Sequence, residues 1–219
     1  RGVLRLAATD SFRLAEEVIS FEEKEEKKSG EPENHSCILP NTVLHELLRV
    51  ITPENKFIQM AFLENQVFFE IDGIEITSRI LNGKYPDYQQ IIPKEFSTQV
   101  VFERALLQRA LKIAGSLSSY TSGEIALVFD EQAQSCTFLS RSQEIGENKT
   151  VLPVEFLKGG APLTLLFNPR YVLEGINALS GEKILFCANT ATSPVALRLM
   201  DEEAKIQDEY LYLVMPIRK

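Results

Sequence analysis

Apolar residues recur along this chain with two periods, one typical of helices and one typical of strands. The helical period appears three times. Each occurrence follows a short extended run and precedes three further strand-like runs. The predicted helices cover residues 41–51, 103–117 and 168–179. The pattern therefore predicts one strand–helix–three-strand unit, repeated three times.

The first unit begins with a brief predicted strand at 37–39, which Pro40 ends. Asn41 can then cap the helix. Its predicted buried face consists of residues at helical spacing, namely Leu44, Leu47, Leu48 and Ile51. Strands are predicted at 57–63, 67–71 and 74–81. Asp72-Gly73 joins the last two, and this pair favours a type I′ hairpin turn.

The second and third units repeat this order. The second has an extended run at 97–102, then the helix, then strands at 124–129, 135–140 and about 149–156. The third has a strand at 163–167, its helix, and strands at 183–188, 195–200 and 209–216. The apolar helix faces are Leu107, Ala110, Leu111 and Ala114 in the second unit, and Val172, Leu173 and Ile176 in the third.

These repeats predict an α+β fold with two helices packed on one face of an antiparallel sheet in each domain. Units two and three would form a complete domain at 94–219. Unit one, with residues 5–15 before it, would be the latter part of another domain at 1–93. The break is expected near Pro93, after the turn-rich residues 82–86. The polar stretch 16–36 is predicted to be a solvated loop or hairpin tip.

Composition narrows the class of protein. Hydrophobic residues make up 44% of the chain and charged residues 25%, both near the averages for globular proteins. No apolar run approaches the roughly 20 residues that cross a bilayer, and the start does not read as a signal peptide. We therefore expect a soluble, cytoplasmic protein with no membrane partner. Three scattered cysteines, Cys37, Cys136 and Cys187, are expected to be buried free thiols.

Catalytic and cofactor motifs are missing from the sequence. His35, His45 and the cysteines are too scattered to predict a metal site. Gly115-Ser116 lacks the frame of a serine hydrolase, and Gly159-Gly160 lacks the residues of a phosphate-binding P-loop. Carboxylates are abundant, but the sequence singles out no pair of them. It therefore argues less strongly against acid–base chemistry than against metal or nucleotide binding. We expect no metal, no cofactor and no enzymatic activity.

Four segments carry a more specific signal. They are LAATDSFRLA at 6–15, TSRILNGKYPDY at 77–88, NPRYVL at 168–173 and YLVMPIRK at 212–219. The first resembles the A-T-D-x-x-R-L-A signature in the middle domain of bacterial DNA sliding clamps, and the second resembles the end of that domain. The third and fourth resemble the start of the last helix and the closing Val-Met-Pro-x-Arg of the same family. The resemblance covers essentially the whole chain.

Sliding clamps are the ring-forming beta subunits of the replicative DNA polymerase III. The resemblance implies three two-helix domains per protomer and a head-to-tail homodimer ring in the full-length protein, with helices lining the hole. This chain would contain the second half of the middle domain and all of the last one, so we expect a monomer or weak association. The implied function is a processivity factor that encircles double-stranded DNA without reading sequence. It would tether the replicative polymerase, the clamp loader and other clamp-motif proteins.

The resemblance also implies a peptide-binding pocket between the middle and last domains, for a short peptide with a Gln and spaced Leu and Phe side chains. The residues mapped onto it are Thr9, Phe12, Arg13, Leu14, Pro86 and Ile91 from the middle domain, Asn168, Tyr171, Leu213, Met215, Pro216, Ile217 and Arg218 from the last domain, and Tyr120 and Ser193 at the rim. By pattern alone, the apolar strand residues among them would be ordinary core.

Two departures from the family pattern bear on peptide preference. Ser11-Phe12 stands where clamps commonly have Gly-His, which makes the wall bulkier and more apolar. Gln89-Gln90 replaces a pair that is often basic.

For DNA, the resemblance points to exposed helix faces. The DNA-facing residues would be Arg49 on the first helix, Arg104, Arg109 and Lys112 on the second, and Arg170 on the third, where Glu174 follows one turn later. Without the resemblance, each is a solvated helix face. The net charge of -8 should repel DNA, so contact would depend on this local basic stripe. Two alternatives remain: an α+β enzyme subunit with a small-molecule site in the cleft between domains, and a repeat protein with no DNA role.

Overall fold

The computed structural model describes residues 2–21, 35–118, 123–142, 146–159, 162–201, 203 and 205–218. It divides into two compact units. The larger combines Arg1–Lys24 with Gln89–Lys219, and the smaller is Glu25–Tyr88. The division of the chain into domains at 1–93 and 94–219 stays a prediction.

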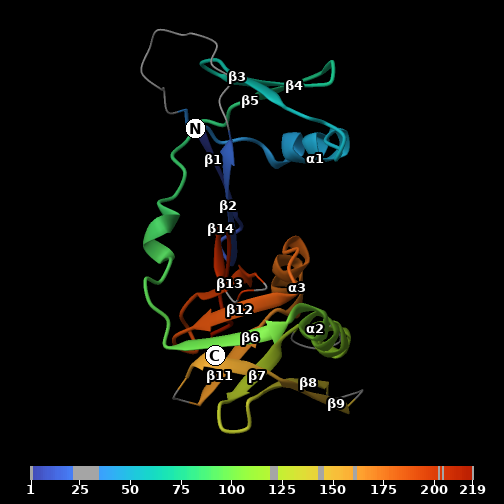
Figure 1. Cartoon of the computed structure of the whole chain (residues 1–219), viewed down its shortest axis with the longest axis vertical. Helices are drawn as coiled ribbons and strands as arrows, with labels where there is room; N and C mark the ends of the chain where they lie inside the picture. The colour runs from blue at the N-terminus through green and yellow to red at the C-terminus, as the bar shows by residue number, and fades with distance from the viewer. Residues whose placement is uncertain are drawn as a thin grey trace. The chain divides into compact units, whose positions relative to one another are not determined.

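Two antiparallel sheets form the larger unit (Figure 1). The first has seven strands in the order β1 (Gly2–Thr9), β2 (Arg13–Phe21), β14 (Ile206–Val214), β13 (Val195–Met200), β12 (Lys183–Ala188), β6 (Thr98–Glu103) and β10 (Glu155–Lys158). The second has four strands in the order β11 (Leu163–Phe167), β7 (Ile125–Asp130), β8 (Ser135–Ser142) and β9 (Gly146–Pro153).

The second and third repeats exchange their first strands. Strand β6 of the second repeat pairs with β12 of the third, and β11 of the third pairs with β7 of the second. The two helices, α2 (Arg104–Ser118) and α3 (Pro169–Ala178), lie side by side (Figure 1). Gln108 Nε2 donates to Asn177 Oδ1 across them at 2.9 Å. The predicted α+β fold, with two helices packed together on a sheet, is confirmed.

Aromatic and aliphatic side chains fill the space between the helices and the sheets. Phe102 makes edge contacts with Phe129, Phe138 and Phe186, at ring-centroid distances of 6.2, 6.4 and 5.9 Å. The predicted apolar face of α2 is fully buried. On α3, Val172 and Ile176 are buried, and Leu173 is half-buried against the same core. Helical periodicity therefore predicted the packed faces of both helices.

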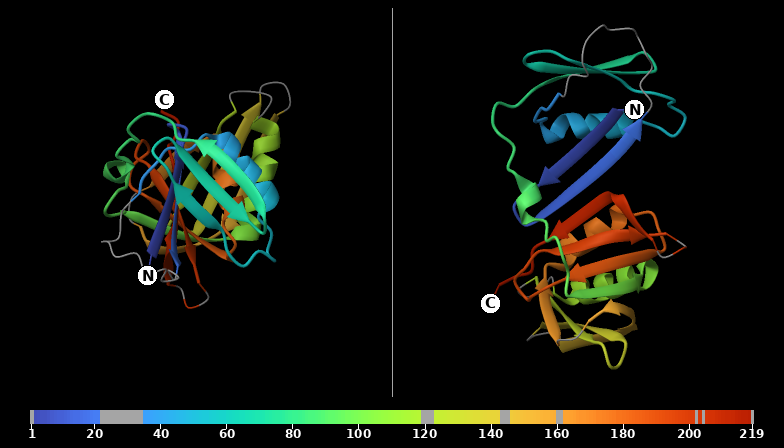
Figure 2. Two further views of the ribbon diagram at one scale, coloured as in Figure 1. Left: turned by 90° about the horizontal axis from the view of Figure 1, so that it is seen from above. Right: turned by 60° about the vertical axis from the view of Figure 1, so that its left-hand side comes forward.

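The β1–β2 hairpin continues the sheet of β12–β14, as Figure 2 shows from two further directions. Strand β2 includes residues 16–21, which the sequence placed in a polar loop, so that part of the prediction is wrong. The charges in this stretch are compatible with a strand because Glu16 is buried in an ion pair with Arg5, 3.0 Å apart. The rest of the predicted loop, 22–34, lies outside the described residues.

The predicted strand at 149–156 is in fact two strands. Strand β9 ends at Pro153 in the four-stranded sheet, and β10 begins at Glu155 in the seven-stranded sheet. Between them, Val154 donates its backbone N–H to Gln134 O at 2.9 Å. One short bend thus carries the chain from one sheet to the other.

The smaller unit packs α1 (Asn41–Val50) against a three-stranded sheet of β3 (Gln59–Phe62), β4 (Gln66–Ile71) and β5 (Ile74–Arg79). Asp72 and Gly73 have φ values of 47° and 82°, as the predicted type I′ turn requires. The described residues 37–39 form no strand; Ile38 O accepts one hydrogen bond from Leu81 N at 2.8 Å. A short 3-10 helix, η1 (Tyr88–Ile91), follows this unit.

Helix α1 differs from its prediction at two points. Pro40, not Asn41, occupies the N-cap position, and no side chain caps the helix. The buried residues are Val43 and Leu47. Leu44, Leu48 and Ile51 were predicted to be buried but are exposed, with Leu48 at 73%. The reason is geometric: a three-stranded sheet covers a narrow stripe of the helix, whereas the apolar pattern is broader.

Candidate functional site: a cleft at the tip of the first hairpin

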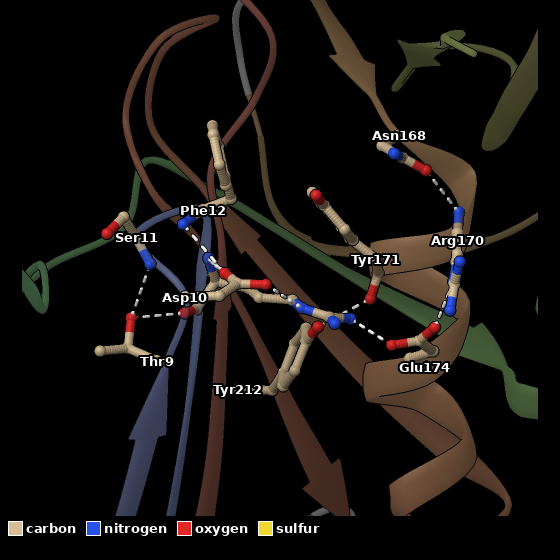
Figure 3. Close-up of polar contacts among 10 residues, drawn as sticks. Thr9, Asp10, Ser11, Phe12, Asn168, Arg170, Tyr171, Glu174 and Tyr212 are labelled. Atoms are coloured by element: carbon tan, nitrogen blue, oxygen red, sulfur yellow. Dashed lines mark hydrogen bonds and ion pairs between the residues drawn. The ribbon is translucent and has the colours of Figure 1, made fainter. Parts of the chain in front are cut away.

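The tip of the β1–β2 hairpin is folded by the short polar side chains of the signature at 6–15. Thr9 Oγ1 donates to Arg13 O at 2.7 Å and accepts from Ser11 N at 3.2 Å. Asp10 Oδ1 accepts from the backbone N–H groups of Phe12 and Arg13, both at 3.0 Å (Figure 3). Such side chains stabilise tight turns by replacing backbone partners. The motif therefore determines the local shape of the tip.

The C-terminal segment runs beside this tip. In the β2–β14 pair, Leu14 lies opposite Leu213. Beyond the strand, Met215 N donates to Phe12 O at 2.8 Å, and Ile217 N donates to Leu166 O at 2.7 Å. Two motifs about 200 residues apart in sequence thus become neighbours in one sheet.

A cleft of about 590 Å³ opens where these segments meet. Its size falls within the range of small-ligand pockets, roughly 300–1,000 Å³. Four segments line it: the hairpin tip, the end of η1, the loop between β12 and β13, and the C-terminal segment. The lining residues are Thr9, Ser11, Phe12, Arg13, Leu14, Ile91, Thr192, Ser193, Pro194, Leu213, Met215 and Arg218.

Nine of the predicted pocket residues lie together around this cleft. They are Thr9, Phe12, Arg13, Leu14, Ile91, Ser193, Leu213, Met215 and Arg218. Leu14 and Leu213 are also buried, so the strand-core interpretation and the pocket interpretation both apply to them. The role of these residues in binding stays a proposal.

Four other predicted residues, all described and all in the larger unit, are not among those that line the cleft. Asn168 caps α3 by accepting from Arg170 N at 3.0 Å, and Tyr171 stacks on Phe12 with ring centroids 6.1 Å apart. Pro216 is buried, and Ile217 bonds to Leu166 instead. Pro86 belongs to the smaller unit, and Tyr120 lies outside the described residues.

Three lining residues were not predicted to belong to the pocket. Ser11 lies inside the signature motif, but the resemblance marks it only as a departure from the family pattern. Thr192 and Pro194 flank the predicted Ser193, and sequence adjacency was the one signal that could have identified them.

Arg13 connects the cleft to helix α3. Its Nε lies 2.9 Å from Asp10 Oδ2, its Nη1 lies 2.5 Å from Glu174 Oε2, and its Cζ lies 4.5 Å from the centre of the Tyr171 ring. Burial alone would lower the pKa of Arg13, but hydrogen bonds to Glu174, Tyr212 and Asp10 raise it above its ordinary value. Arg13 is therefore permanently charged and already paired.

Tyr212 and Gly175 bring α3 close to strand β14. The Tyr212 hydroxyl donates to Tyr171 O at 2.7 Å (Figure 3). Burial raises the pKa of this hydroxyl, although Arg13 opposes the shift. A Cβ at Gly175 would collide with the Tyr212 ring, so this close approach requires glycine.

The predicted DNA-facing residues differ in their exposure to solvent and in the hydrogen bonds and ion pairs that they make. Arg109 and Lys112 are exposed on α2. Arg104 is half-buried, and its Nη1 donates to Leu179 O at 2.6 Å. Arg170 is exposed but paired with Glu174 at 2.6 Å, and Arg49, in the smaller unit, is paired with Glu46 at 3.0 Å.

Metal and membrane features can be assessed over the part of the chain that the structure describes. Within it, no group of three or more His, Cys, Asp or Glu side chains could hold a metal ion. None of its described helices combines the length and apolar character needed to cross a membrane. Cys136 and Cys187 are buried free thiols as predicted, whereas Cys37 is half-buried.

Comparison with known proteins gives a consistent assignment. Residues 89–218 match the family model for the DNA polymerase III beta subunit, C-terminal domain, and residues 1–87 match that for its central domain. A beta sliding clamp of Synechococcus elongatus is 33% identical over 98% of this chain and 55% of its own length. One from Streptococcus pneumoniae is 27% identical over 98% of this chain and 53% of its own length.

Solved structures agree with the sequence matches. The DNA polymerase III beta chain of Streptococcus pneumoniae superposes with a TM-score of 0.85 at 27% identity, covering 99% of this chain and 54% of that one. The beta subunit of Thermotoga maritima gives 0.84 at 28% identity, covering 99% and 55%. The chain spans about half the length of the curated relatives it matches. Because the C-terminal-domain model alone matches more than half of its residues, this chain belongs to the family of the DNA polymerase III beta subunit, the beta sliding clamps.

Proposed function

We propose that this chain is part of a non-catalytic processivity factor that encircles duplex DNA and tethers the replicative polymerase, the clamp loader and other proteins. The ring would be a homodimer of the whole protein. The cleft at the hairpin tip would be the docking site, which takes a short peptide with a Gln and spaced Leu and Phe side chains.

The gathering around one cleft of nine residues that the resemblance implied for the pocket, with Ser193 at its rim, carries this proposal. Apolar side chains from β2, β14 and the C-terminal segment line it, and the hydroxyls of Thr9, Ser11 and Ser193 supply polar groups. Binding sites for short peptides combine apolar anchor pockets with a few polar groups that fix orientation. The cleft meets this requirement.

The charges of the cleft support a binding role over a catalytic one. Among the described residues that line it, two are ionisable, Arg13 and Arg218. Arginine is a poor general acid or base because it does not lose its proton at physiological pH. The described lining of this cleft therefore offers the enzyme alternative no general acid or base.

Direct binding tests the docking site. A fluorescent peptide of the Gln-x-x-Leu-Phe type should bind the chain. Met215→Ala should weaken binding about tenfold because it removes an apolar side chain from the lining of the cleft. The matched control is Met60→Ala, an exposed methionine of strand β3 in the smaller unit. Absence of binding by the parent, or equal affinity of the parent and Met215→Ala, would contradict the proposal.

A further inference from the structure

Four charged side chains form a continuous chain from the cleft to the surface of α3 (Figure 3). Asp10 pairs with Arg13 at 2.9 Å, Arg13 pairs with Glu174 at 2.5 Å, and Glu174 pairs with Arg170 at 2.6 Å. Two positive and two negative charges cancel. The cleft wall that contains Arg13 therefore presents a cation whose charge is already balanced.

Glu174 is the central member of this chain. Its Oε2 accepts from Arg13 Nη1, and its Oε1 accepts from Arg170 Nε. Each carboxylate oxygen therefore serves one arginine, and the carboxylate is held between the cleft and the exposed face of α3. Its side chain is 40% exposed, so a change there need not disturb the core.

Asp10 could not be changed with the same selectivity. Its Oδ1 accepts from two backbone N–H groups of the hairpin tip, so its loss would alter the fold of the tip as well as the charge of Arg13. Glu174 has no such role in the turn. Its removal changes the electrostatics of Arg13 while the backbone of the cleft is retained.

We infer that Glu174 determines which peptides the cleft accepts: by pairing with the guanidinium of Arg13, it makes this wall suited to uncharged side chains and unsuited to a carboxylate. This inference rests on the proposed docking function. When Glu174 is present, a ligand carboxylate must compete with it for Arg13 Nη1 and is repelled by its charge. When it is absent, that nitrogen can donate to the ligand instead.

The second cation of the cleft does not explain such a preference. Arg218 lines the cleft, is exposed, and lies outside the four-charge chain. It would attract a ligand carboxylate equally in the parent and in a Glu174 variant. A ratio of affinities for neutral and acidic peptides therefore isolates the effect of Glu174.

The experiment compares a neutral Gln-x-x-Leu-Phe peptide with three acidic versions, each carrying one Glu at its first, second or third position. Fluorescence anisotropy gives the affinity of each for the parent chain, for Glu174→Gln and for Glu174→Asp. In Glu174→Gln, at least one acidic peptide should gain about threefold to fivefold relative to the neutral peptide, the size expected for a partly exposed ion pair. Glu174→Asp, which keeps the charge, should behave as the parent does.

The control removes a comparable charge elsewhere. Glu147→Gln on β9 breaks an exposed pair with Arg141, 2.8 Å apart, and should leave the ratio unchanged. A merely structural role of Glu174 would lower affinity for all peptides together, and that outcome contradicts the inference. A parent that binds no peptide would contradict the docking function itself. A parent that binds, with an unchanged ratio in Glu174→Gln, would contradict the role of Glu174 alone.

Discussion

Ser11 adopts a φ of 74°, a conformation that residues with a Cβ rarely adopt. Glycine, which the resemblance gave as the family residue here, would adopt this conformation without steric cost. The neighbouring bonds, from Ser11 N to Thr9 Oγ1 and from Phe12 N to Asp10 Oδ1, hold the turn in this shape. The tip of the hairpin therefore stores a small amount of backbone strain.

Ser11→Gly should relieve that strain. We expect the free energy of unfolding to rise by about 0.5–1 kcal/mol, the difference between the cost of a left-handed non-glycine residue and the greater chain entropy of glycine. Urea denaturation would measure it. Ser20→Gly, at an exposed position of β2 with ordinary strand geometry, should lower stability instead. A loss of stability in Ser11→Gly would contradict the idea of strain.

The ionised form of Glu174 should make stability depend on pH. Hydrogen bonds from Arg170 and Arg13 hold the pKa of Glu174 below its ordinary value of 4.5. Its stabilising contribution is therefore present above that pH and is lost as the pH falls through the lowered folded-state pKa. Melting temperatures from about pH 7 to about pH 3 should fall more steeply for the parent than for Glu174→Gln. Parallel curves would show that the pairing contributes nothing to folding.

At the scale of single residues, motifs predicted much of the cleft and periodicity predicted little of it. Leu14 and Met215 could be assigned because each lies in a motif with a family position. Thr192 and Pro194 could not, because they reach the cleft through a loop between β12 and β13 whose path depends on tertiary packing. Nor does the sequence indicate the pairing of Arg13 with Glu174, 161 residues apart.

Among the elements, helices buried on one broad face were predicted best. The whole predicted face of α2 is buried because two sheets and α3 surround it. Helix α1 has the same kind of pattern, yet Leu48 is exposed because its unit supplies only three strands. The apolar periodicity of a helix predicts how broad its apolar face is. How much of that face is buried depends on the strands and helices packed against it.

Gly175→Ala tests the close contact between α3 and β14. Alanine favours a helix by about 1 kcal/mol over glycine, but overpacking against a buried ring costs about 1–3 kcal/mol. Since Tyr212 is buried and its hydroxyl bonds to Tyr171 O, the ring has little room to move. We expect a net loss of about 1 kcal/mol or more in urea denaturation.

The matched change is Gly115→Ala in α2. Its added methyl would meet Pro169 at 3.3 Å, a mild contact, so the helical preference of alanine should offset most of the cost. Equal effects of the two substitutions would contradict the special role of the Gly175 contact.

On the scale of the whole molecule, the sequence predicted the number of repeats but not how they interlock. Local periodicity describes each repeat as a separate unit, whereas β6 and β11 each pair with a strand of the other repeat. The pairing of β2 with β14 likewise joins the two ends of the chain. Such long-range pairings are decided by burial across the assembled sheet, which local periodicity does not record.

The net charge of -8 makes DNA contact depend on a few exposed cations, and the structure separates these from the paired ones. Arg109 and Lys112 are free to meet phosphates, whereas Arg104 is held by Leu179 O. If α2 faces DNA, the pair Arg109→Ala and Lys112→Ala should reduce the slope of log affinity against log salt by about 1–2, because each neutralised phosphate contributes about 0.9. Arg104→Ala should lower thermal stability and leave that slope nearly unchanged.

Anisotropy of a short labelled duplex at several low salt concentrations would measure the slope. If the whole protein forms the proposed ring around DNA, topology rather than strong contacts would hold the duplex, and a shallow parental slope is expected. An unchanged slope in the double variant would mean that Arg109 and Lys112 on α2 do not face DNA. The basic stripe would then be a solvated helix face, and the acidic character of the chain would govern its interaction with nucleic acid.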